Sequence, residues 1–579
     1  MVHGFPTVGD IPDSELWRPC ERTAASPFAE FASDNVAWVA RCKHRVLAAA
    51  RADRERATAC WQRTVEEASC GLILGPFSAS QLNQPARTGF PALGFGKWRP
   101  LPRFAIRQKG KWRCIDDGAA SGTNAHGMTT HETIVCDRPD SPLRIGLRFH
   151  ELGPPPSAPM IAVRMGGGTD DKFAAYRAVV TAHPGYTVVM VAKPPSSDNG
   201  DWTECFFRVP GHNFGLASAV LNFYHVAEPP TVFSRLFFGA PVTRYYDDHG
   251  VHEPAYAAGS GQSCHFALHE LLRFHFDFSK HAPWSRAVLY TGVLTDWSND
   301  DQGVVTIGVS RARRDSVRQL IAEALESGTL TAASASSLRG KARFCLCPVF
   351  GRVGLAAVHL LSQRQRAHSD SSVDEALTEV LLFLDVVIDK LPAFEVRFRR
   401  ERVRPAAVVL SDASWETNHS WLGFLVICPI CGARWAGSPT PMWLLALLRR
   451  HKLAQTYIGQ LELAAAAAPY FSLPREWWVD RPVMHYIDNQ GACYGLIHGR
   501  ASDSDANRLV FVTNMRIALF RCDVWYDYVP SASNIADLPT RLDARAFARL
   551  EALAQRTPLC LPPEWCLDCP HSALAQLFQ

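Results

Sequence analysis

TRYYDDHG, residues 243–250, places two aspartates side by side directly after two tyrosines. Adjacent carboxylates repel each other, and a cation between them relieves that repulsion. The apolar residues on both sides, in FGAPVTRYYDDHGV, predict a tight turn between two strands. Carboxylates held in such a turn can share divalent ions, and Mg²⁺ takes oxygen ligands together with substrate phosphates. The stretch therefore predicts a metal site, with a solvated surface pair as the alternative.

A third carboxylate is expected on a neighbouring strand, and Asp171 in TDDKFAAYRAV, residues 169–179, is the candidate. Asp170 is a less favoured substitute for it. Two metal ions roughly 3.5–4 Å apart would let one activate a 3′-hydroxyl and the other stabilise a leaving pyrophosphate. We expect these acids to converge in the fold.

A basic segment precedes these acids. Residues 86–114 contain eight Lys and Arg and no Asp or Glu, interleaved with Trp98, Phe104 and Trp112. Unbalanced positive charge among aromatic rings is typical of a surface that follows a nucleic-acid backbone. A solvated basic face is the alternative.

The second half of the chain repeats the acidic pattern. Apolar segments each present one acid: Asp412 in VVLSDASW, Glu462 in YIGQLELAAAAA, Asp488 in VMHYIDNQGA and Asp537 in VPSASNIADLPTR. A buried acidic cluster needs cations, because like charges raise one another's pKa. Two Mg²⁺ ions would neutralise it and bridge a scissile phosphate. A helix cap or a surface carboxylate is the alternative for each acid taken alone.

The first set of motifs resembles that of reverse transcriptases. FAIRQKGKWRCIDDG (104–118) is similar to their basic fingers strand, DDKFAAY to their first palm motif, FGLASAVLNF (214–223) to their glycine motif, and YYDD to their YxDD box. The order of the motifs along the chain is also that of the family. Two positions depart from the family pattern, Val220 for a proline and Phe214 for a polar residue.

The resemblance implies a role for each site residue. Asp171, Asp247 and Asp248 would hold the metals, and Tyr176 would exclude a 2′-hydroxyl and so select dNTPs. The other residues that it implies in substrate binding are Lys109, Lys111, Arg113, Gly215, Tyr245 and Lys280. Among these, Arg113 would meet the nucleotide triphosphate, and Gly215 would let the backbone approach the template or nucleotide closely.

The second set resembles the ribonuclease H domain of retroelements, in which the acids follow the order Asp, Glu, Asp, Asp. NIADLPTR resembles the form found in DIRS-like and related retrotransposons more than that of retroviruses. The resemblance implies that Asp412, Glu462, Asp488 and Asp537 are catalytic and that each active site holds two Mg²⁺ or Mn²⁺ ions. Its substrate would be an RNA–DNA hybrid.

The cysteines admit two interpretations. CPIC (428–431) and CLDC (566–569), with His571, have the spacing of zinc ligands. The two pairs lie far apart in sequence, and CPIC falls in an expected hairpin, so reduced packing cysteines are favoured.

Length and composition fit an intracellular protein of the cytoplasm or nucleus. The chain has 579 residues, 47% of them hydrophobic, and a formal net charge of +4, and no apolar run is long enough to cross a membrane. The expected fold is an α+β right-hand polymerase followed by an α/β ribonuclease H-like domain. The expected divisions are a helical extension (1–85), fingers and palm (86–300), a helical thumb and connection (301–395), a basic linker (396–404), the ribonuclease H-like domain (405–545) and a tail (546–579).

The sequence thus predicts a retrotransposon RNA-directed DNA polymerase with ribonuclease H activity. Its partners would be an RNA template, a DNA primer, their hybrid and dNTPs. No integrase or recombinase is recognisable, so we expect another chain of the element to supply one or this copy to be truncated. A degenerate or domesticated remnant that binds nucleic acid without catalysis is the alternative, and an RNA-copying polymerase is a further rival.

Overall fold

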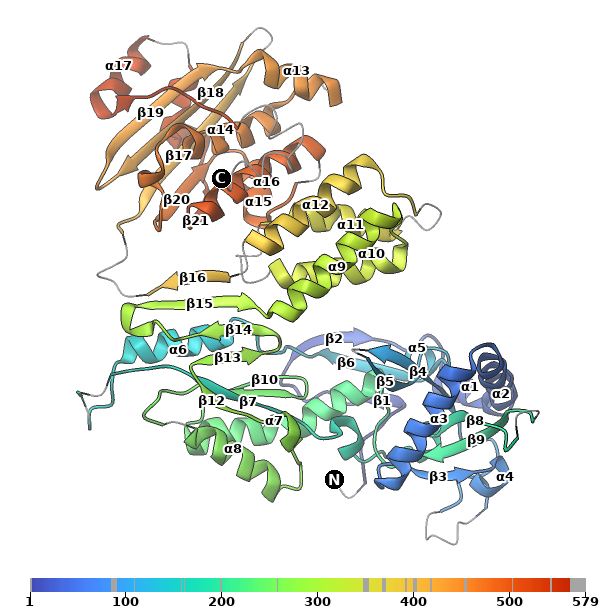
Figure 1. Cartoon of the computed structure of the whole chain (residues 1–579). Helices are drawn as coiled ribbons and strands as arrows, with labels where there is room; N and C mark the ends of the chain where they lie inside the picture. The colour runs from blue at the N-terminus through green and yellow to red at the C-terminus, as the bar shows by residue number, and fades with distance from the viewer. Residues whose placement is uncertain are drawn as a thin grey trace. The chain divides into compact units, whose positions relative to one another are not determined.

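The structure is a computed structural model that describes residues 3–84, 91–108, 110–157, 159–160, 162–197, 200–257, 259–346, 353–366, 371–390, 393–398, 404–416, 419–451, 456–501, 503–541 and 544–562. The chain divides into two compact units, residues 1–286 and 287–579 (Figure 1). Each unit combines sheets with helices, so the mixed α/β character expected from the sequence is confirmed. No helix among the described residues is long and apolar enough to span a bilayer.

The first sheet of unit 1 has the order β3-β9-β8-β4-β5. Its strands are β3 (Leu74–Phe77), β9 (Thr203–Arg208), β8 (Val189–Lys193), β4 (Leu101–Gln108) and β5 (Lys111–Asp116). Successive residues of β8 pack on opposite faces of the sheet. Met190 packs with Trp38 of α2 (Asn35–Ala52), whereas its neighbour Val189 packs with Cys60 of α3 (Arg54–Ser69). Alternation along a strand explains this, since successive side chains point to opposite faces. Residues 1–85 therefore supply part of this unit's core rather than an extension to it.

A second sheet of unit 1 has the order β10-β11-β7-β12. Its strands are β10 (Val242–Tyr245), β11 (Asp248–Val251), β7 (Gly167–Asp171) and β12 (Ala282–Ser285), and helices α7 (Ala217–Phe238) and α8 (Ser260–Leu271) pack together beside it (Figure 1). A small sheet joins β1 (Gly9–Ile11), β6 (Met128–Thr133) and β2 (Arg18–Arg22). The remaining α-helices described in unit 1 are α1 (Phe28–Ser33), α4 (Ala79–Leu82), α5 (Thr123–His126) and α6 (Ser141–Leu152).

Unit 2 begins with a sheet that carries a helical excursion. Strands β13 (Ala287–Tyr290), β14 (Val293–Asp296), β15 (Val304–Val309) and β16 (Ala393–Arg397) pair in that order, all antiparallel. Between β15 and β16 come α9 (Arg311–Ser327), α10 (Ala332–Leu346), α11 (Leu355–Arg366) and α12 (Glu375–Lys390). Val317, Ile321 and Ala324 of α9 are buried, as its apolar spacing predicts.

Two expected boundaries differ from the structure here. The units divide before residue 300, because β13 pairs with β14 of unit 2. The expected linker at 396–404 starts inside a strand, since Arg397 belongs to β16 and pairs with Val304. Residues 399–403 of that segment lie outside the described residues.

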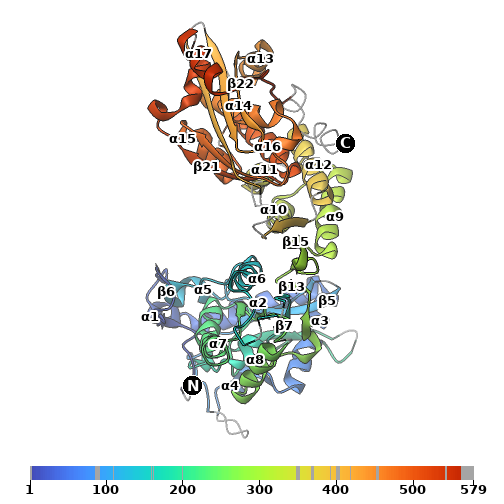
Figure 2. The same cartoon turned by 90° about the vertical axis from the view of Figure 1, so that its left-hand side faces the viewer.

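The C-terminal sheet has the order β21-β20-β17-β18-β19-β22. Its strands are β17 (Ala407–Trp415), β18 (Ser420–Cys428), β19 (Gly432–Pro439), β20 (Pro482–Ile487), β21 (Asp523–Tyr528) and β22 (Gln555–Arg556). The helices here are α13 (Met442–His451), α14 (Ile458–Ser472), α15 (Gln490–His498), α16 (Ser504–Leu519) and α17 (Ala544–Leu553), and α14 and α16 lie side by side (Figures 1 and 2). Because β22 pairs with β19 and Leu550 packs with Leu410, the fold continues past the expected boundary at 545.

Candidate active sites

The YYDD stretch forms the predicted turn between two strands. Tyr245 pairs with Asp248 across the β10–β11 hairpin, and Tyr246 and Asp247 make the turn between them. Tyr246 has a positive φ of 54°, and its backbone N–H donates to the Tyr224 hydroxyl at 2.7 Å. The second hairpin strand, β11, also pairs with β7, which carries the third acid.

Strand pairing and the turn bring Asp171, Asp247 and Asp248 near one another at this point of the sheet. Asp171 at the end of β7 lies directly opposite Asp248, and the backbone N–H of Lys172 donates to the Asp247 carbonyl at 3.0 Å. Burial and then the charge of Asp171 raise the pKa of Asp247, while the charges of Lys280 and Arg113 oppose that rise. Asp171 Oδ1 is buried and has no hydrogen-bond partner among the described residues. The predicted convergence of these acids therefore has support in the fold.

Asp170 does not belong to this group. Its side chain is 3% exposed, accepts from Gln262 Nε2 at 2.9 Å and lies 2.7 Å from His281 Nδ1. Consecutive strand residues point to opposite faces, so Asp170 and Asp171 cannot serve the same site. The expectation that Asp170 could substitute for Asp171 is wrong.

Two of the expected basic residues lie close to the acids. Lys280 Nζ donates to Asp171 Oδ2 at 2.7 Å, and Arg113 on β5 is near enough to influence the pKa of Asp247. Lys111 begins the same strand and is exposed, whereas Lys109 lies outside the described residues. A basic strand therefore runs beside the carboxylates.

The two tyrosines, Tyr176 and Tyr245, both lie between Asp171 and Asp247 in sequence. Tyr176, in a 3₁₀ turn at Ala175–Ala178, packs edge-on against Phe214 and Phe223 at centroid distances of 4.9 and 5.5 Å. Burial and then the charge of Asp247 raise the pKa of Tyr176, so its hydroxyl stays protonated. Tyr245 is 38% exposed, with its ring edge-on to that of Tyr246. Phe214 thus has a packing partner in the ring of Tyr176.

Gly215 is required for a reason that the sequence does not reveal. Its φ is +116°, and a Cβ atom there would lie 2.0 Å from the Asp116 carbonyl oxygen. The close approach is therefore to the chain's own backbone at the last residue of β5. This contact alone accounts for a glycine at position 215, and the expected approach of its backbone to template or nucleotide stays a prediction.

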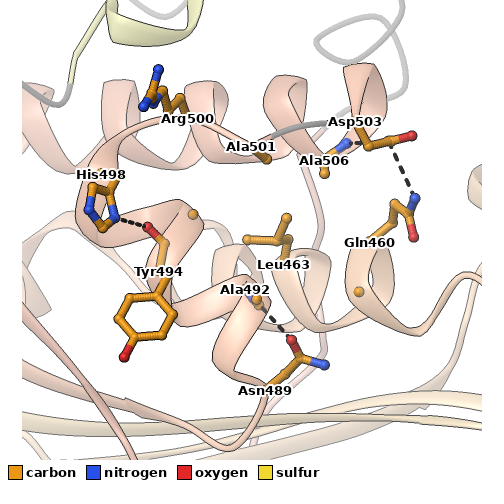
Figure 3. Close-up of a pocket in the computed structure, with 13 residues that line it drawn as sticks. Gln460, Leu463, Asn489, Ala492, Tyr494, His498, Arg500, Ala501, Asp503 and Ala506 are labelled. Atoms are coloured by element: carbon orange, nitrogen blue, oxygen red, sulfur yellow. Dashed lines mark hydrogen bonds between the residues drawn. The ribbon is translucent and has the colours of Figure 1, made fainter.

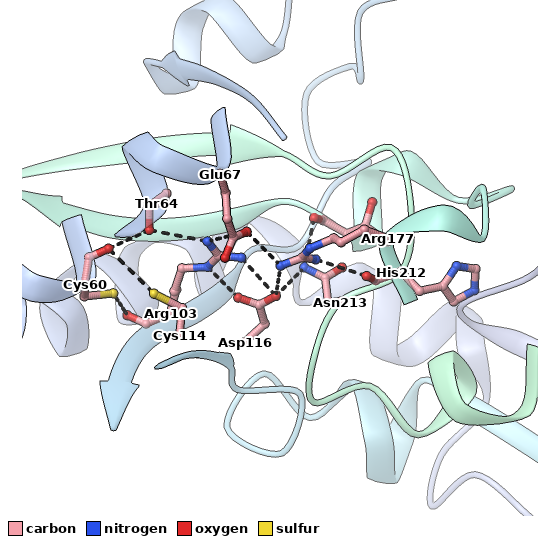
Figure 4. A network of polar contacts seen from close by, with 10 residues as sticks. Cys60, Thr64, Glu67, Arg103, Cys114, Asp116, Arg177, His212 and Asn213 are labelled. Carbon is pink, nitrogen blue, oxygen red and sulfur yellow. Dashed lines mark hydrogen bonds and ion pairs between the residues drawn. The ribbon is translucent and has the colours of Figure 1, made fainter. Parts of the chain in front are cut away.

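A buried ion network joins strands β4 and β5 to the turn that contains Tyr176 (Figure 4). The sequence did not reveal this network. Asp116 Oδ1 accepts from Arg103 Nε at 2.6 Å, and Asp116 Oδ2 accepts from Arg177 at 3.1 Å and Asn213 at 3.0 Å. Glu67 accepts from both arginines at 3.2 and 3.3 Å. Although burial opposes it, the charges of Arg103 and Arg177 hold the pKa of Asp116 below its usual value. The network fixes β5 relative to the Tyr176 turn.

Three acids of the second set also meet. One carboxylate oxygen from each of Asp412 on β17, Glu462 on α14 and Asp488 after β20 lies within 4.8 Å of the other two. Burial, together with the neighbouring acids, raises the pKa of Asp412 to about 7 and that of Glu462 to about 9. Thr540 Oγ1, which the sequence analysis did not single out, donates to Asp412 Oδ2 at 2.5 Å. This group is therefore strained electrostatically in the absence of a cation.

Asp537 lies at the edge of this group. It is in the 3₁₀ turn Ile535–Thr540 that packs on β17 and β18, and it forms an ion pair with Arg541. Its charge is near enough to raise the pKa of Asp412, but it is not among the three acids whose oxygens meet. The structure therefore brings three of the four predicted acids together and leaves the fourth beside them.

The donor sets of both sites fit hard divalent cations. Asp171 Oδ1, Glu462 Oε2 and Asp488 Oδ1 are all buried without a hydrogen-bond partner among the described residues. A buried carboxylate oxygen without a partner is costly, and Mg²⁺ and Mn²⁺ favour such oxygens. The cysteines give no comparable support. Cys428 and Cys431 lie at the β18–β19 turn, where Arg481 donates to Cys428, and the second pair lies outside the described residues.

A cavity of about 470 Å³ lies among α14, α15 and the start of α16 (Figure 3). Gln460 and Asn489, next to Glu462 and Asp488 in sequence, line it together with Tyr494, His498 and Arg500. Asn489 caps α15 by accepting from the Ala492 N–H at 3.0 Å. Polar side chains therefore border this cavity, and its lining includes sequence neighbours of Glu462 and Asp488 but not the acids themselves.

Comparison with known proteins gives a distant likeness. Three solved structures of foamy viral protease-reverse transcriptase, two with double-stranded DNA and one with an RNA/DNA hybrid, are similar at 12–13% identity and TM-scores of 0.35–0.36. The matches cover 77–82% of this chain and 52–83% of those chains. No protein-family model matches the chain, and no curated protein matches it.

Proposed function

We propose that the chain is an RNA-directed DNA polymerase of a retroelement that also cleaves the RNA strand of RNA–DNA hybrids. The observation that carries the proposal is that each unit brings predicted acids together. In unit 2, oxygens of Asp412, Glu462 and Asp488 lie within 4.8 Å of one another. In unit 1, Asp171 pairs with Asp248 across the sheet, and its buried Oδ1 has no hydrogen-bond partner among the described residues. An acid cluster with a basic strand beside it suits transfer of phosphoryl groups between nucleic-acid ends. The proposed partners are an RNA template, a DNA primer, the hybrid and dNTPs.

In unit 1, Asp171, Asp247 and Asp248 would hold Mg²⁺ or Mn²⁺. When bound there, such ions would supply the positive charge that favours a deprotonated primer 3′-hydroxyl and a leaving pyrophosphate. Arg113 would bind the triphosphate, because a guanidinium pairs with phosphate oxygens bidentately. Tyr176 would lie beneath the sugar, where its packed ring leaves no room for a 2′-hydroxyl. Lys280 neutralises Asp171 in the free protein.

In unit 2, Asp412, Glu462 and Asp488 would hold the metal ions, and Asp537 would complete the set when substrate is bound. The raised pKa of Glu462 means that its ionised form needs a cation nearby at neutral pH. Thr540 orients Asp412 through its hydrogen bond. Gln460, Asn489 and Arg500 line the cavity and would contact the strand that is not cut.

The alternative is a retroelement remnant that binds nucleic acid without catalysis. Primer extension on an RNA template separates the two, with dNTPs and rNTPs supplied in turn. We expect extension with dNTPs only, and release of short RNA fragments from a labelled hybrid. Extension with rNTPs would favour an RNA-copying polymerase, and binding without extension would favour the remnant.

The same assays test the residue assignments. The double substitution Asp247→Asn, Asp248→Asn should abolish extension and leave hybrid cleavage intact, and Asp488→Asn should do the reverse. Extension that survives the first change, or cleavage that survives the second, contradicts the corresponding assignment.

A further inference from the structure

Three buried histidines lie together behind the catalytic hairpin. His249 follows Asp248 on β11, and His265 and His269 lie one helical turn apart on α8. None of the three side chains has exposed surface, and one ring nitrogen of each lies within 4.8 Å of the other two. The i, i+4 spacing places both helix histidines on one face, and strand alternation turns His249 away from Asp248. The three histidines belong to no recognised sequence motif, so the sequence alone does not point to this triad.

The hydrogen bonds around the triad leave two nitrogens without partners. Ser234 Oγ donates to the Pro230 carbonyl at 2.9 Å, so it accepts from His265 Nδ1 at 2.7 Å. His265 Nε2 is then an acceptor, and it lies 3.0 Å from His249 Nδ1.

The Nε2 atoms of His249 and His269 are buried and have no hydrogen-bond partner among the described residues. Each such orphan costs about 1–3 kcal/mol. Two orphans in one small cluster indicate that a ligand belongs between them.

We propose that His249, His265 and His269 bind a divalent transition metal ion of the zinc class. Imidazole nitrogens in a closed, oxygen-poor setting favour Zn²⁺ over Mg²⁺. The ion would join β11 to α8 and so fix the strand that carries Asp248. This inference is independent of the proposed function, because it rests on residues that take no part in the chemistry described above.

Lys172 provides the rival explanation of the triad. Its Nζ lies 2.6 Å from His269 Nδ1 and 3.4 Å from the centroid of the Phe276 ring. In the rival explanation the histidines serve only as hydrogen-bond partners for the buried Lys172 amino group, whose pKa burial lowers to about 6. The two explanations predict different results for Lys172→Met. If the triad binds a metal ion, removing the amino group that competes for His269 tightens binding; if the histidines only bind Lys172, the variant still binds no metal ion.

The test is a Co²⁺ titration of the full chain, first stripped with a chelator and then saturated with Mg²⁺ so that the carboxylate groups are occupied. We expect one tightly bound equivalent, intense visible absorption typical of tetrahedral Co²⁺, and imidazole scattering at the cobalt X-ray absorption edge. Lys172→Met should tighten binding by about tenfold or more.

His265→Gln should lose the bound equivalent. His212→Gln is the matched control, because His212 is equally buried but both its ring nitrogens are bonded, to the Val179 carbonyl at 2.7 Å and to Asn222 at 2.8 Å. This control should retain the bound equivalent.

Three results would overturn the proposal: Co²⁺ that Mg²⁺ displaces completely, an absorption edge that shows only oxygen ligands, or a His265→Gln variant that keeps the bound equivalent. If His265→Gln does not fold, the edge spectrum of the unmodified chain decides, because it reports the ligand atoms directly.

Discussion

Asp170 and Asp171 are consecutive in sequence and lie in opposite environments. The sequence could predict that one of them joins Asp247 and Asp248, but not which one, because the phase of a strand depends on its partner. Pairing of Asp171 with Asp248 settles the phase. The His249, His265 and His269 triad could not be predicted at all, since it needs a strand and a helix to meet.

The first prediction concerns this pair of aspartates. Asp171→Asn should lower the rate of primer extension by on the order of 100-fold or more, because it removes a charge that the transition state needs. Asp170→Asn makes the same chemical change on the opposite face of β7, away from Asp248, and should leave the extension rate within a few-fold of that of the unmodified chain. Single-turnover extension measures both variants, and equal losses would contradict the division of roles.

The second prediction concerns the pH dependence of stability at the second acidic group. The pKa of Glu462 is raised from 4.5 to about 9 in the metal-free fold. Between these values the native state binds more protons than the unfolded state, so stability falls as pH rises, by up to about 1.4 kcal/mol per pH unit from this group. When a chelator is present, the melting temperature should therefore fall as pH rises from about 5 to about 8, a range that lies between the two pKa values of Glu462.

Glu462→Gln should flatten that dependence, and Mg²⁺ should reduce it in the unmodified chain. Glu326→Gln, a change to an exposed glutamate of the same unit, should leave the slope as it is. A melting temperature in chelator that rises across the window would show that Glu462 is ionised in the fold without metal.

At the scale of elements, α7 lies between two glycines, Gly215 and Gly239, which differ in the space around them. Both have positive φ, but a Cβ at Gly239 would meet nothing within 4 Å, while one at Gly215 would collide with Asp116. The sequence could predict the strands and helices here from their apolar spacing. It could not predict the collision or the Asp116 network, because the sequence places Asp116 only at the end of a basic strand and does not show which residues surround it.

The third prediction compares these two glycines. Gly215→Ala should lower the free energy of unfolding by on the order of 3 kcal/mol, since it combines backbone strain with displacement of a loop. Gly239→Ala should cost about 1 kcal/mol, the penalty of the left-handed conformation alone. Urea unfolding of the full chain measures both free energies, and equal losses would show that the backbone at Asp116 moves aside freely.

At the scale of the whole molecule, the two acidic groups belong to separate compact units. The existence of two acid sets could be predicted from their order along the chain. The division before residue 300 could not, because Ala287–Tyr290 has the same short apolar pattern as the strands before it and only its pairing with β14 assigns it to unit 2.

The fourth prediction follows from that separation. Calorimetry of the metal-free chain should resolve two unfolding transitions, and Glu462→Gln should raise the temperature of one and leave the other in place. Asp247→Asn should act on the other transition only, because burial and the charge of Asp171 raise the pKa of Asp247. A single transition shifted by both changes would show that the units unfold as one.

The excursion between β15 and β16 constrains how this chain could vary. Gly308 and Ala393 are neighbours in the sheet although four helices separate them in sequence, so relatives could lengthen the connections at the helix tips without disturbing the strands. Removal of the four helices would disturb the fold, because Phe383 of α12 packs against Phe511 of α16. The helices between β15 and β16 share one hydrophobic core with the C-terminal sheet. Homologues should therefore show insertions here but keep all four helices.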